Sequence, residues 1–399
     1  MEFPEGEYRQ RVGRARALMA EGNLDALVVT GDYTAAPNYR YFTGHVPRDY
    51  QSNSARPHLL LLTGDGDAAI CVHFFSEAPA RECWVKNIHV YTQPFRHTDA
   101  LALFRTLGVA AGRVGVELGL DQRLMMPVAD YERLKADLPG IEWVDAGPLL
   151  WRLRMIKSPA EVAAIREADR INGNALRKAF GRANVGMTEK QIYELCVHAL
   201  VEEGSLRPPH TQMTISSSAR YRGKGMVTPF SGPTDEPLHR GDLVFIDSGA
   251  IVNGYWGEFN RMAVMGPPGT EQTRWHDIAR GIVMGFIREI LRPGITCERA
   301  MQQAFGLYDR AGLDPAQYKL YVGYPYFHLC QGLGLNSSEH PLVRITDRTV
   351  IEPGMVFSVE AYVRGPDMQY GSEEDVAITP SGCEVLSEPD AGLYVIGEG

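Results

Sequence analysis

Four carboxylates in apolar, strand-like stretches are the residues of this sequence best placed to do chemistry. Asp247 and Glu258 stand at the two ends of an alternating run that a Gly turn divides into a hairpin, and Glu360 and Glu374 lie in two strand-like runs near the C-terminus. A carboxylate inside an apolar strand is costly unless a cation, a proton or a hydrogen-bond network neutralises it. We therefore expect the four to meet in one site, where packed carboxylates share protons and titrate as a group.

Basic residues in two segments could serve this site. The segment 213–229 contains no histidine and three cations, of which Lys224 or Arg222 could reach the carboxylates. A buried lysine beside acids acts as a proton carrier or a counter-ion; a solvated glycine loop is the plainer alternative. His328 lies three residues before Gln331 and could act as a base, with a structural histidine as the alternative. We expect Lys224 or His328 to complete a proton relay.

Charge and composition exclude several classes of partner. A net charge of -9 argues against a nucleic acid or an anionic membrane surface. The first residues lack the basic and apolar regions of a signal peptide, and no apolar run approaches the length of a membrane span. The six cysteines are scattered without metal-type spacing, as in proteins with reduced thiols. We expect a cytoplasmic protein that acts on a small-molecule substrate.

The chain is organised as two domains. In the first 150 residues, buried strand patterns at 24–30, 58–63 and 113–118 alternate with a helical pattern at 125–138, which predicts an α/β domain. Ser158-Pro-Ala-Glu161 is a capping box that opens a helix, and a second box begins at Thr188. Strand patterns, the hairpin and helices at 271–291 and 297–311 follow. The predicted domains are 1–152 and 153–399.

The motifs together carry a resemblance to a known family. The hairpin, the run Gln331-Gly-Leu-Gly-Leu335 and the two late Glu strands resemble the creatinase, methionine aminopeptidase and aminopeptidase P family in order and spacing. Arg154 to Glu161 looks like the linker of the creatinase and Xaa-Pro peptidase branch, and Asn38 to Gly44 looks like its N-domain signature. The resemblance implies an α/β N-terminal domain followed by an α+β C-terminal domain with the pita-bread fold.

The resemblance also implies a metal site, from which this sequence departs. The metal-dependent members hold two cations with two Asp on the hairpin, one His and two late Glu. Here Asp247, Glu360 and Glu374 match, whereas Glu258 stands where the second Asp is expected and Gln331 where the His is expected. These five residues would make an all-oxygen site, suited to Mg or Mn if a metal binds.

Further site residues follow from position in the family. Glu339 lies in the region that approaches the scissile bond in the peptidases. The loop after the N-domain signature approaches the partner subunit's pocket in the family, so Arg48 or Arg56 is expected to grip a substrate carboxylate. Gln331 and His340 complete the expected substrate-binding set.

The preferred interpretation is a homodimeric, creatinase-like hydrolase. It would cleave a C–N bond of an amide, lactam, amidine or guanidino group in a small polar substrate, without a tight dinuclear metal centre. The nearest alternative is a metal-dependent Xaa-Pro dipeptidase or aminopeptidase that uses Mn or Mg. A lyase of the same family and a non-catalytic binding module remain open, because a fold does not dictate a function.

Overall fold

The computed structural model describes residues 2–34, 36–47, 55–92, 94–205, 214–221, 232–314 and 329–397. The chain divides into two compact units, Met1–Arg154 and Met155–Gly399. The domain boundary expected after residue 152 stays a prediction.

The first unit contains a six-stranded sheet with the strand order β4-β3-β2-β1-β5-β6. The pairs β1–β2 and β2–β3 are antiparallel, whereas β3–β4, β1–β5 and β5–β6 are parallel. The strands are β1 (Ala26–Gly31), β2 (His58–Thr63), β3 (Ala68–His73), β4 (Asn87–Tyr91), β5 (Ala111–Val116) and β6 (Gly140–Asp145). The helices are α1 (Glu5–Glu21), α2 (Pro37–Thr43), α3 (Glu77–Ala80), α4 (His97–Leu107), α5 (Val128–Asp137) and α6 (Gly147–Met155), with a short 3-10 turn at Phe74–Ser76.

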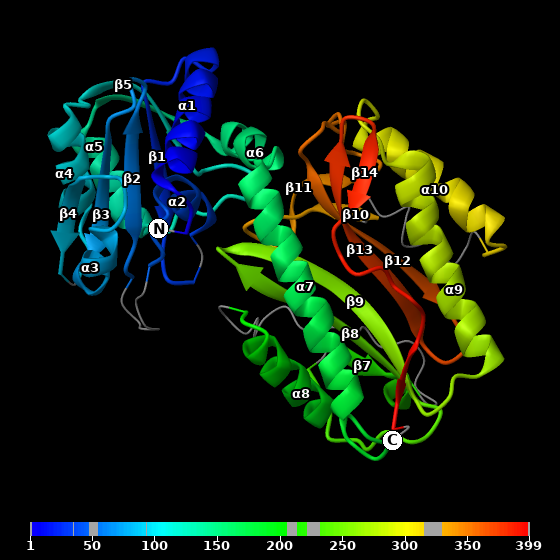
Figure 1. Cartoon of the computed structure of the whole chain (residues 1–399). Coiled ribbons are helices and arrows are strands. Elements are labelled where there is room, and N and C mark those ends of the chain that lie inside the picture. The colour runs from blue at the N-terminus through cyan, green and yellow to red at the C-terminus, as the bar shows by residue number, and fades with distance from the viewer. Residues whose placement is uncertain are drawn as a thin grey trace. The chain divides into compact units, whose positions relative to one another are not determined.

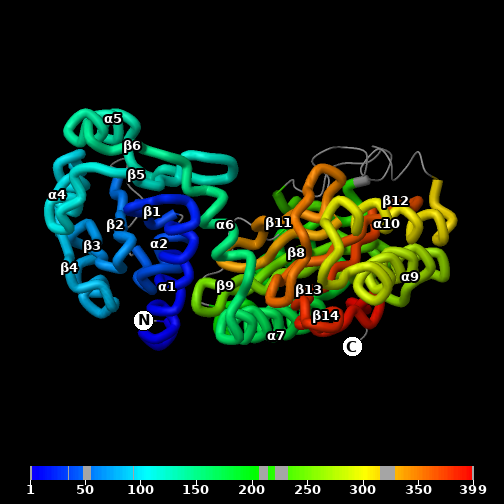
Figure 2. Tube along the Cα trace, turned by 90° about the horizontal axis from the view of Figure 1, so that it is seen from above, coloured from blue at the N-terminus to red at the C-terminus, as the bar shows by residue number. Residues whose placement is uncertain are grey.

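Helices cover both faces of this sheet. Phe104 of α4 and Leu134 of α5 belong to one buried cluster with Val28, Leu61 and Val114 of the strands. Figures 1 and 2 both place α1 and α2 on the opposite side of the sheet from α4. The strands β1 and β2 are buried along their whole length, as expected for continuous apolar runs between helical layers. The predicted α/β domain is therefore present.

Four main helices lie in the described ranges of the second unit, and two of them begin where the capping boxes predict. Ser158 Oγ accepts a hydrogen bond from the Glu161 amide, and the Glu161 carboxylate accepts one from the Ser158 amide. Thr188 and Gln191 cap the next helix in the same way. The helices are α7 (Pro159–Arg182), α8 (Glu189–Glu202), α9 (Thr270–Gly285) and α10 (Cys297–Arg310). A π-helical turn at Phe286–Ile290 continues α9, and a separate 3-10 turn at Ser218–Tyr221 follows β7.

Two sheets of this unit position the candidate site. One has the order β15-β9-β8-β7 and the other β11-β10-β12-β13-β14. The strands are β7 (Thr214–Ser217), β8 (Leu243–Val252), β9 (Tyr255–Met265), β10 (Cys330–Gly332), β11 (Glu339–Val343), β12 (Val356–Arg364), β13 (Gln369–Thr379), β14 (Gly382–Val385) and β15 (Tyr394–Ile396). Figure 1 shows α7 and α8 along the first sheet and α9 and α10 beside β12 and β13. This is the predicted α+β arrangement of helices around largely antiparallel sheets.

The state of the cysteines and the polarity of the helices were both subjects of expectations from composition. All six cysteines are free, and five of them are buried. Cys330 is fully buried, and burial raises the pKa of its thiol well above the usual value, so it is a packed apolar residue. None of the helices in the described ranges is long and apolar enough to cross a membrane.

Candidate active site

The hairpin of β8 and β9 brings its two carboxylates to one face. Val252 and Tyr255 pair across a two-residue turn, Asn253-Gly254, in which both residues have positive φ (50° and 83°). Asn-Gly suits this turn because both residues tolerate the left-handed region. From this turn the register pairs Asp247 with Asn260 and Gly249 with Glu258. Directly paired residues and those two positions along a strand share a face, so both acids point the same way.

A third carboxylate reaches this face from β13. Oxygens of Asp247, Glu258 and Glu373 all lie within 4.8 Å of one another. Glu373 is held in place by donors: the amide and the side chain Nδ2 of Asn260 both donate to Oε2, at 2.9 and 2.7 Å, and Ser358 Oγ donates to Oε1 at 2.6 Å. The three acids are therefore a preformed oxygen cluster.

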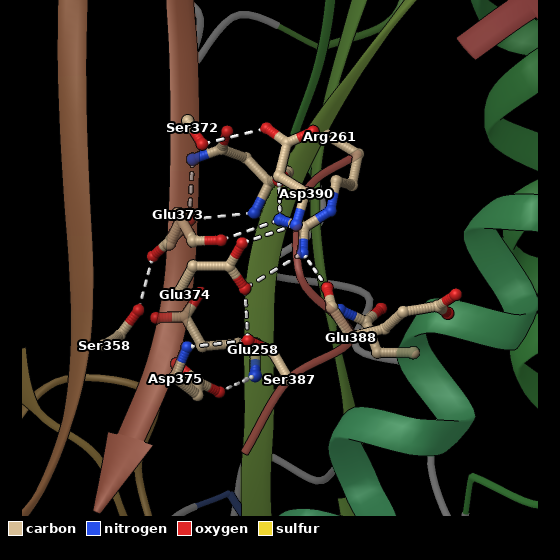
Figure 3. A network of polar contacts seen from close by, with 12 residues as sticks. Glu258, Arg261, Ser358, Ser372, Glu373, Glu374, Asp375, Ser387, Glu388 and Asp390 are labelled. Atoms are coloured by element: carbon tan, nitrogen blue, oxygen red, sulfur yellow. Dashed lines mark hydrogen bonds and ion pairs between the residues drawn. The ribbon is translucent and has the colours of Figure 1, made fainter. Parts of the chain in front are cut away.

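The prediction had placed Glu374, not Glu373, in this group, and the structure corrects it. Neighbouring residues of a strand point to opposite sides, so only one of the two can face the hairpin acids. Glu374 points away and accepts from Arg261 Nη2 at 3.1 Å, from Ser387 Oγ and from the Asp390 amide at 2.6 Å (Figure 3). Arg261 also donates to the carbonyl of Glu373 at 2.7 Å. We call Arg261, Glu374, Ser387 and Asp390 the arginine network. Arg261 and Glu374 form a buried salt bridge.

Glu360 completes the group from β12. It pairs directly across from Glu373 on β13, so the two side chains share a face. Glu360 hydrogen-bonds the hydroxyl of Tyr362, two residues along the same strand. Both residues are only half-buried, whereas the other residues of the strand as far as Val363 are buried. We call Asp247, Glu258, Glu360 and Glu373 the acid cluster.

Gln331 contacts the acid cluster through its amide N–H. Its Nε2 donates to Glu258 Oε1 at 2.8 Å. Gln331 lies on β10, which pairs with β12, so two segments 73 residues apart in sequence meet at this bond. The two residues at which the sequence departs from the family pattern are thus in direct contact.

Burial and mutual repulsion dominate the electrostatics of the acid cluster. Burial raises the pKa of Asp247, Glu258 and Glu373 well above the usual range, and the neighbouring carboxylates raise it further. Burial and the charge of Asp247 raise the pKa of Glu360 to about 7. Such a group takes up either protons or a cation near neutral pH.

A second acid pair lies beside the cluster. Asp375 Oδ2 accepts from the Glu258 amide at 2.9 Å, and burial together with the neighbouring Asp169 of α7 raises the pKa of Asp375 well above its usual range. Burial raises the pKa of Asp169 to about 8, so this pair favours a protonated carboxyl near neutral pH. Asp375 and Glu373 therefore both accept backbone amides of β9, which fixes β13 against the hairpin.

The remaining predicted residues lie elsewhere or outside the described ranges. Glu339 is buried against Lys157, with Oε2 at 3.7 Å from Nζ, and accepts the Asn336 amide at 2.9 Å; it is not part of the acid cluster. His340 is half-buried on β11, which pairs with β10. Arg56 belongs to the first unit, is 3% exposed and lies over the ring of Phe75. Arg48, Lys224 and His328 lie outside the described residues, and their roles stay predictions.

The donor set of the cluster fits one hard cation. Asp247 Oδ1 is buried and accepts no hydrogen bond from the described residues, which leaves it open to a ligand. Together with oxygens of Glu258 and Glu373 it offers the all-oxygen environment that Mg or Mn prefers. A second cation would need Gln331 as a ligand, but its N–H points to Glu258 and cannot coordinate a metal.

The sequence analysis did not identify several residues of the site. Four of them lie on strands: Glu373, Asp375, Asn260 and Tyr362. Because side chains alternate along a strand, one known contact would have shown which residues of each strand face the site. Asp169 lies in α7 and carries no signal, because an acidic residue in an amphipathic helix is expected at the surface.

Comparison with known proteins matches both halves of the chain. Residues 163–380 match the metallopeptidase family M24, and residues 11–156 match the creatinase/prolidase N-terminal domain. An Xaa-Pro dipeptidase of Pyrococcus horikoshii is 25% identical over 389 residues, which covers 96% of this chain and 98% of that protein. An Xaa-Pro dipeptidase of Lactobacillus helveticus is 27% identical over 274 residues, which covers 68% and 70%.

Solved structures share the fold over the full length. The dipeptidase PepE of Mycobacterium ulcerans superposes with a TM-score of 0.76 at 23% identity and covers 100% of both chains. The X-Pro aminopeptidase of Thermotoga maritima superposes with a TM-score of 0.78 at 20% identity, covering 96% of this chain and 99% of the other.

Proposed function

The chain is a hydrolase that belongs to metallopeptidase family M24, and from that premise we propose that it cleaves a C–N bond in a small polar substrate at a site holding at most one cation. The resemblance drawn from the sequence, and the fold that it implies, are thereby confirmed. The class of substrate and the role of each residue belong to the proposal.

The hydrogen bond from Gln331 to Glu258 carries the proposal. In the metal-dependent members the resemblance places a histidine and an aspartate at these positions, both as ligands. Here the amide N–H satisfies a carboxylate oxygen that a second cation would otherwise use. Because removing Gln331 would take this donor from Glu258, a buried carboxylate, the two departures support each other.

Acid–base chemistry by the cluster follows from its geometry. Glu360 is half-buried and lies beside Asp247, so it can take a proton from an attacking water. Glu258 is more deeply buried, and its Oε1 accepts from Gln331, which leaves Oε2 to carry a proton. The water oxygen forms a bond to the substrate carbon, the C–N bond breaks, and the nitrogen leaves with the proton of Glu258.

A bound cation would be held by Asp247, Glu258 and Glu373. When present it would supply a positive charge that polarises the substrate carbonyl or amidine carbon. Glu373 is already positioned for this by three donors, so it would need little rearrangement.

Cleavage of an Xaa-Pro dipeptide is the second candidate. The relatives named above are Xaa-Pro dipeptidases, and the three-oxygen cluster supports one Mn or Mg ion. An Xaa-Pro bond is itself a C–N bond, so the two candidates differ in substrate and not in the type of reaction. The cytoplasmic location and the homodimer stay predictions.

Turnover of a substrate panel with and without metal would separate these candidates. Protein dialysed against chelator, and the same protein with Mn²⁺, would be incubated with Ala-Pro, 2-pyrrolidinone, 2-methylimidazoline and guanidinoacetate, and products followed by NMR. We expect hydrolysis of a lactam, amidine or guanidino compound and at most one Mn²⁺ per chain by plasma mass spectrometry. Two Mn²⁺ per chain with turnover of Ala-Pro alone would overturn the proposal. No turnover of any compound would favour a binding module.

A double substitution tests whether the hydrogen bond between Gln331 and Glu258 limits metal binding. The double variant Gln331→His/Glu258→Asp restores the family pattern, and we expect it to gain one Mn²⁺ per chain over the parent. Gln331→Glu is the matched control, because it adds an oxygen ligand without an imidazole. Equal Mn²⁺ content in the double variant and the parent would show that the Gln331–Glu258 contact does not limit metal binding.

A further inference from the structure

Tyr362 lies beside the acid cluster but takes no part in the acid–base steps proposed above. It follows Glu360 by two positions on β12, and residues two apart on a strand share a face. Its hydroxyl hydrogen-bonds the Glu360 carboxylate. Both side chains are half-buried, whereas Val359, Ala361 and Val363 around them are buried. The pair therefore lies at a part of the acid cluster that water can reach.

The ring of Tyr362 is held in place by three other strands. Gly371 of β13 pairs directly with Tyr362, and a Cβ on this glycine would lie 2.9 Å from Tyr362 Cε1. The same Cβ would lie 2.8 Å from Phe245 of β8 and 3.1 Å from Asn260 Oδ1 of β9. The ring centroids of Phe245 and Tyr362 are 6.0 Å apart. The ring thus occupies a space that exists only because residue 371 has no side chain, and its hydroxyl reaches Glu360 from a fixed position.

Like charges surround Glu360 on the inner side of the site. The carboxylates of Asp247, Glu258 and Glu373 lie within 4.8 Å of one another and repel the charge of Glu360. A half-buried glutamate can relieve such repulsion by turning toward water, because its terminal torsion is broad. A base that turns away is no longer aligned with the reacting atoms. Glu360 therefore needs a partner that holds it inward.

Two other carboxylates of the acid cluster have a neutral donor of this kind. Gln331 Nε2 donates to Glu258 at 2.8 Å, and Ser358 Oγ donates to Glu373 at 2.6 Å. The Tyr362 hydroxyl is the corresponding donor at Glu360. A phenol keeps its proton at neutral pH and has one proton to donate, so it engages one carboxylate oxygen and leaves the other open.

We propose that Tyr362 is a positioning residue that holds the Glu360 carboxylate toward the acid cluster and leaves one of its oxygens free for the attacking water. This inference rests on the proposed function, in which Glu360 takes a proton from that water. Because the ring is fixed by β8, β9 and β13, the donor is in place before a substrate binds. A residue that acts in this way affects the rate of the chemical step more than the affinity for substrate.

Steady-state kinetics of Tyr362→Phe, with the substrate identified by the panel, measures this role. The variant removes the hydroxyl and keeps the ring over Gly371. We expect kcat to fall about ten- to a hundredfold while KM stays nearly unchanged, because the base is misplaced and the ring still fills its space. Tyr370→Phe is the matched control and should leave kcat unchanged. Tyr370 belongs to the buried cluster against which Tyr362 packs, and its hydroxyl lies 3.4 Å from Asp367, outside the acid cluster.

Urea unfolding of the same two variants separates positioning from a purely structural role. Each variant loses one hydroxyl and keeps its ring, so the two midpoints should shift by similar, small amounts. A fall in kcat that accompanies a much larger midpoint shift in Tyr362→Phe than in Tyr370→Phe would mean that the hydroxyl supports the fold, and would overturn the positioning role.

Crystal structures of the full-length parent and of Tyr362→Phe keep this inference separate from the proposed function. We expect the Glu360 carboxylate to turn toward solvent in the variant. A carboxylate that stays in place would overturn the positioning role, whatever the kinetics show. Movement of Glu360 with unchanged kcat, or in a protein that hydrolyses none of the panel compounds, would overturn Glu360 as the base and leave the hold of Tyr362 on it standing.

Discussion

Glu373 and Glu374 are neighbours on β13, and both are buried, yet their surroundings are opposite. Glu374 faces a guanidinium, a hydroxyl and a backbone amide, and all three oppose the rise in the pKa of Glu374 that its burial causes. Glu373 faces Asp247 and Glu258, and burial together with the charge of Glu360 raises its pKa. In Figure 3, dashed lines join Glu373 to Ser358, and Glu374 to Arg261 and Ser387.

The difference separates a structural region from a chemical one. The arginine network satisfies itself: Arg261 binds Glu374 and the carbonyl of Glu373, while Asp390 Oδ2 lies 3.2 Å from His276 Nε2. The acid cluster leaves oxygens open and like charges adjacent, which lowers stability in exchange for reactivity. Substitutions should therefore affect stability on one side of β13 and activity on the other.

The largest effect is expected from Asp247→Asn. Asp247 raises the pKa of Glu360, the proposed base, and would hold the cation, so its loss should lower kcat by about 10²- to 10⁴-fold, the size of the acid–base contribution that depends on it. Stability should stay equal or rise by about 1 kcal/mol, because one buried repulsion is removed. Steady-state kinetics on the substrate found by the panel and urea unfolding would measure both, with the exposed Asp367→Asn as control. A fall in stability with retained activity would reverse the assignment.

Arg261→Met should give the largest loss of stability. It leaves Glu374 buried without its cation, which typically costs about 3–5 kcal/mol. The double variant Arg261→Met/Glu374→Gln removes that charge and should recover most of the loss. Urea unfolding of the single and double variants measures this coupling. If the single variant unfolds within about 1 kcal/mol of the parent, the ion pair between Arg261 and Glu374 does not stabilise the fold as expected.

A third buried acid, in the first unit, extends the comparison through its pH dependence. Glu117 accepts hydrogen bonds from Thr30 and Asn38, yet burial raises its pKa from 4.5 to about 7. The folded state therefore binds this proton more tightly than the unfolded state. Its contribution is complete below pH 4.5 and is lost as the pH rises through about 7, up to roughly 3 kcal/mol at about 1.4 kcal/mol per pKa unit.

Hydrogen exchange of peptides from β1 and β5, compared at pH 5 and pH 8 after correction for intrinsic rates, would measure this loss. Glu117→Gln cannot ionise, so its protection should not change between the two pH values, although its absolute stability is lower. Equal protection of the parent at both values would mean that the hydrogen bonds alone keep Glu117 charged.

The sequence predicted the hairpin but could not show which side chains of β13 face it. Alternation and the Asn-Gly turn determine that Asp247 and Glu258 share a face. Glu373, Glu374 and Asp375 are consecutive acids, so the sequence does not show whether Glu373 or Glu374 faces the hairpin. Only the pairing of Glu373 with Glu360 decides this. The resemblance therefore pointed to Glu374 where the structure has Glu373, although the predicted fold was right.

Contacts between distant segments were also beyond the sequence. Gln331 and Glu258 each depart from the family pattern, but their hydrogen bond depends on how two sheets meet. Likewise Lys157 and Glu339 form a buried ion pair between two distant segments, and the role of Glu339 near a scissile bond stays a prediction. Residue types could identify candidates, and the packing of the sheets decided which of them meet.

The smallest expected effect comes from two matched serines, one on each side of β13. Ser358 Oγ donates to Glu373 and Ser387 Oγ donates to Glu374. Each bond to a charged group is worth about 1.5 kcal/mol or slightly more. Ser387→Ala should lower the free energy of unfolding by about that amount and leave kcat unchanged. Ser358→Ala should lower kcat roughly tenfold, because Glu373 loses the donor that positions it. The change in the free energy of unfolding should be smaller, because repulsion in the acid cluster already limits what this hydrogen bond contributes to folding. Equal effects of the two substitutions on both quantities would mean that the two sides of β13 do not differ in role.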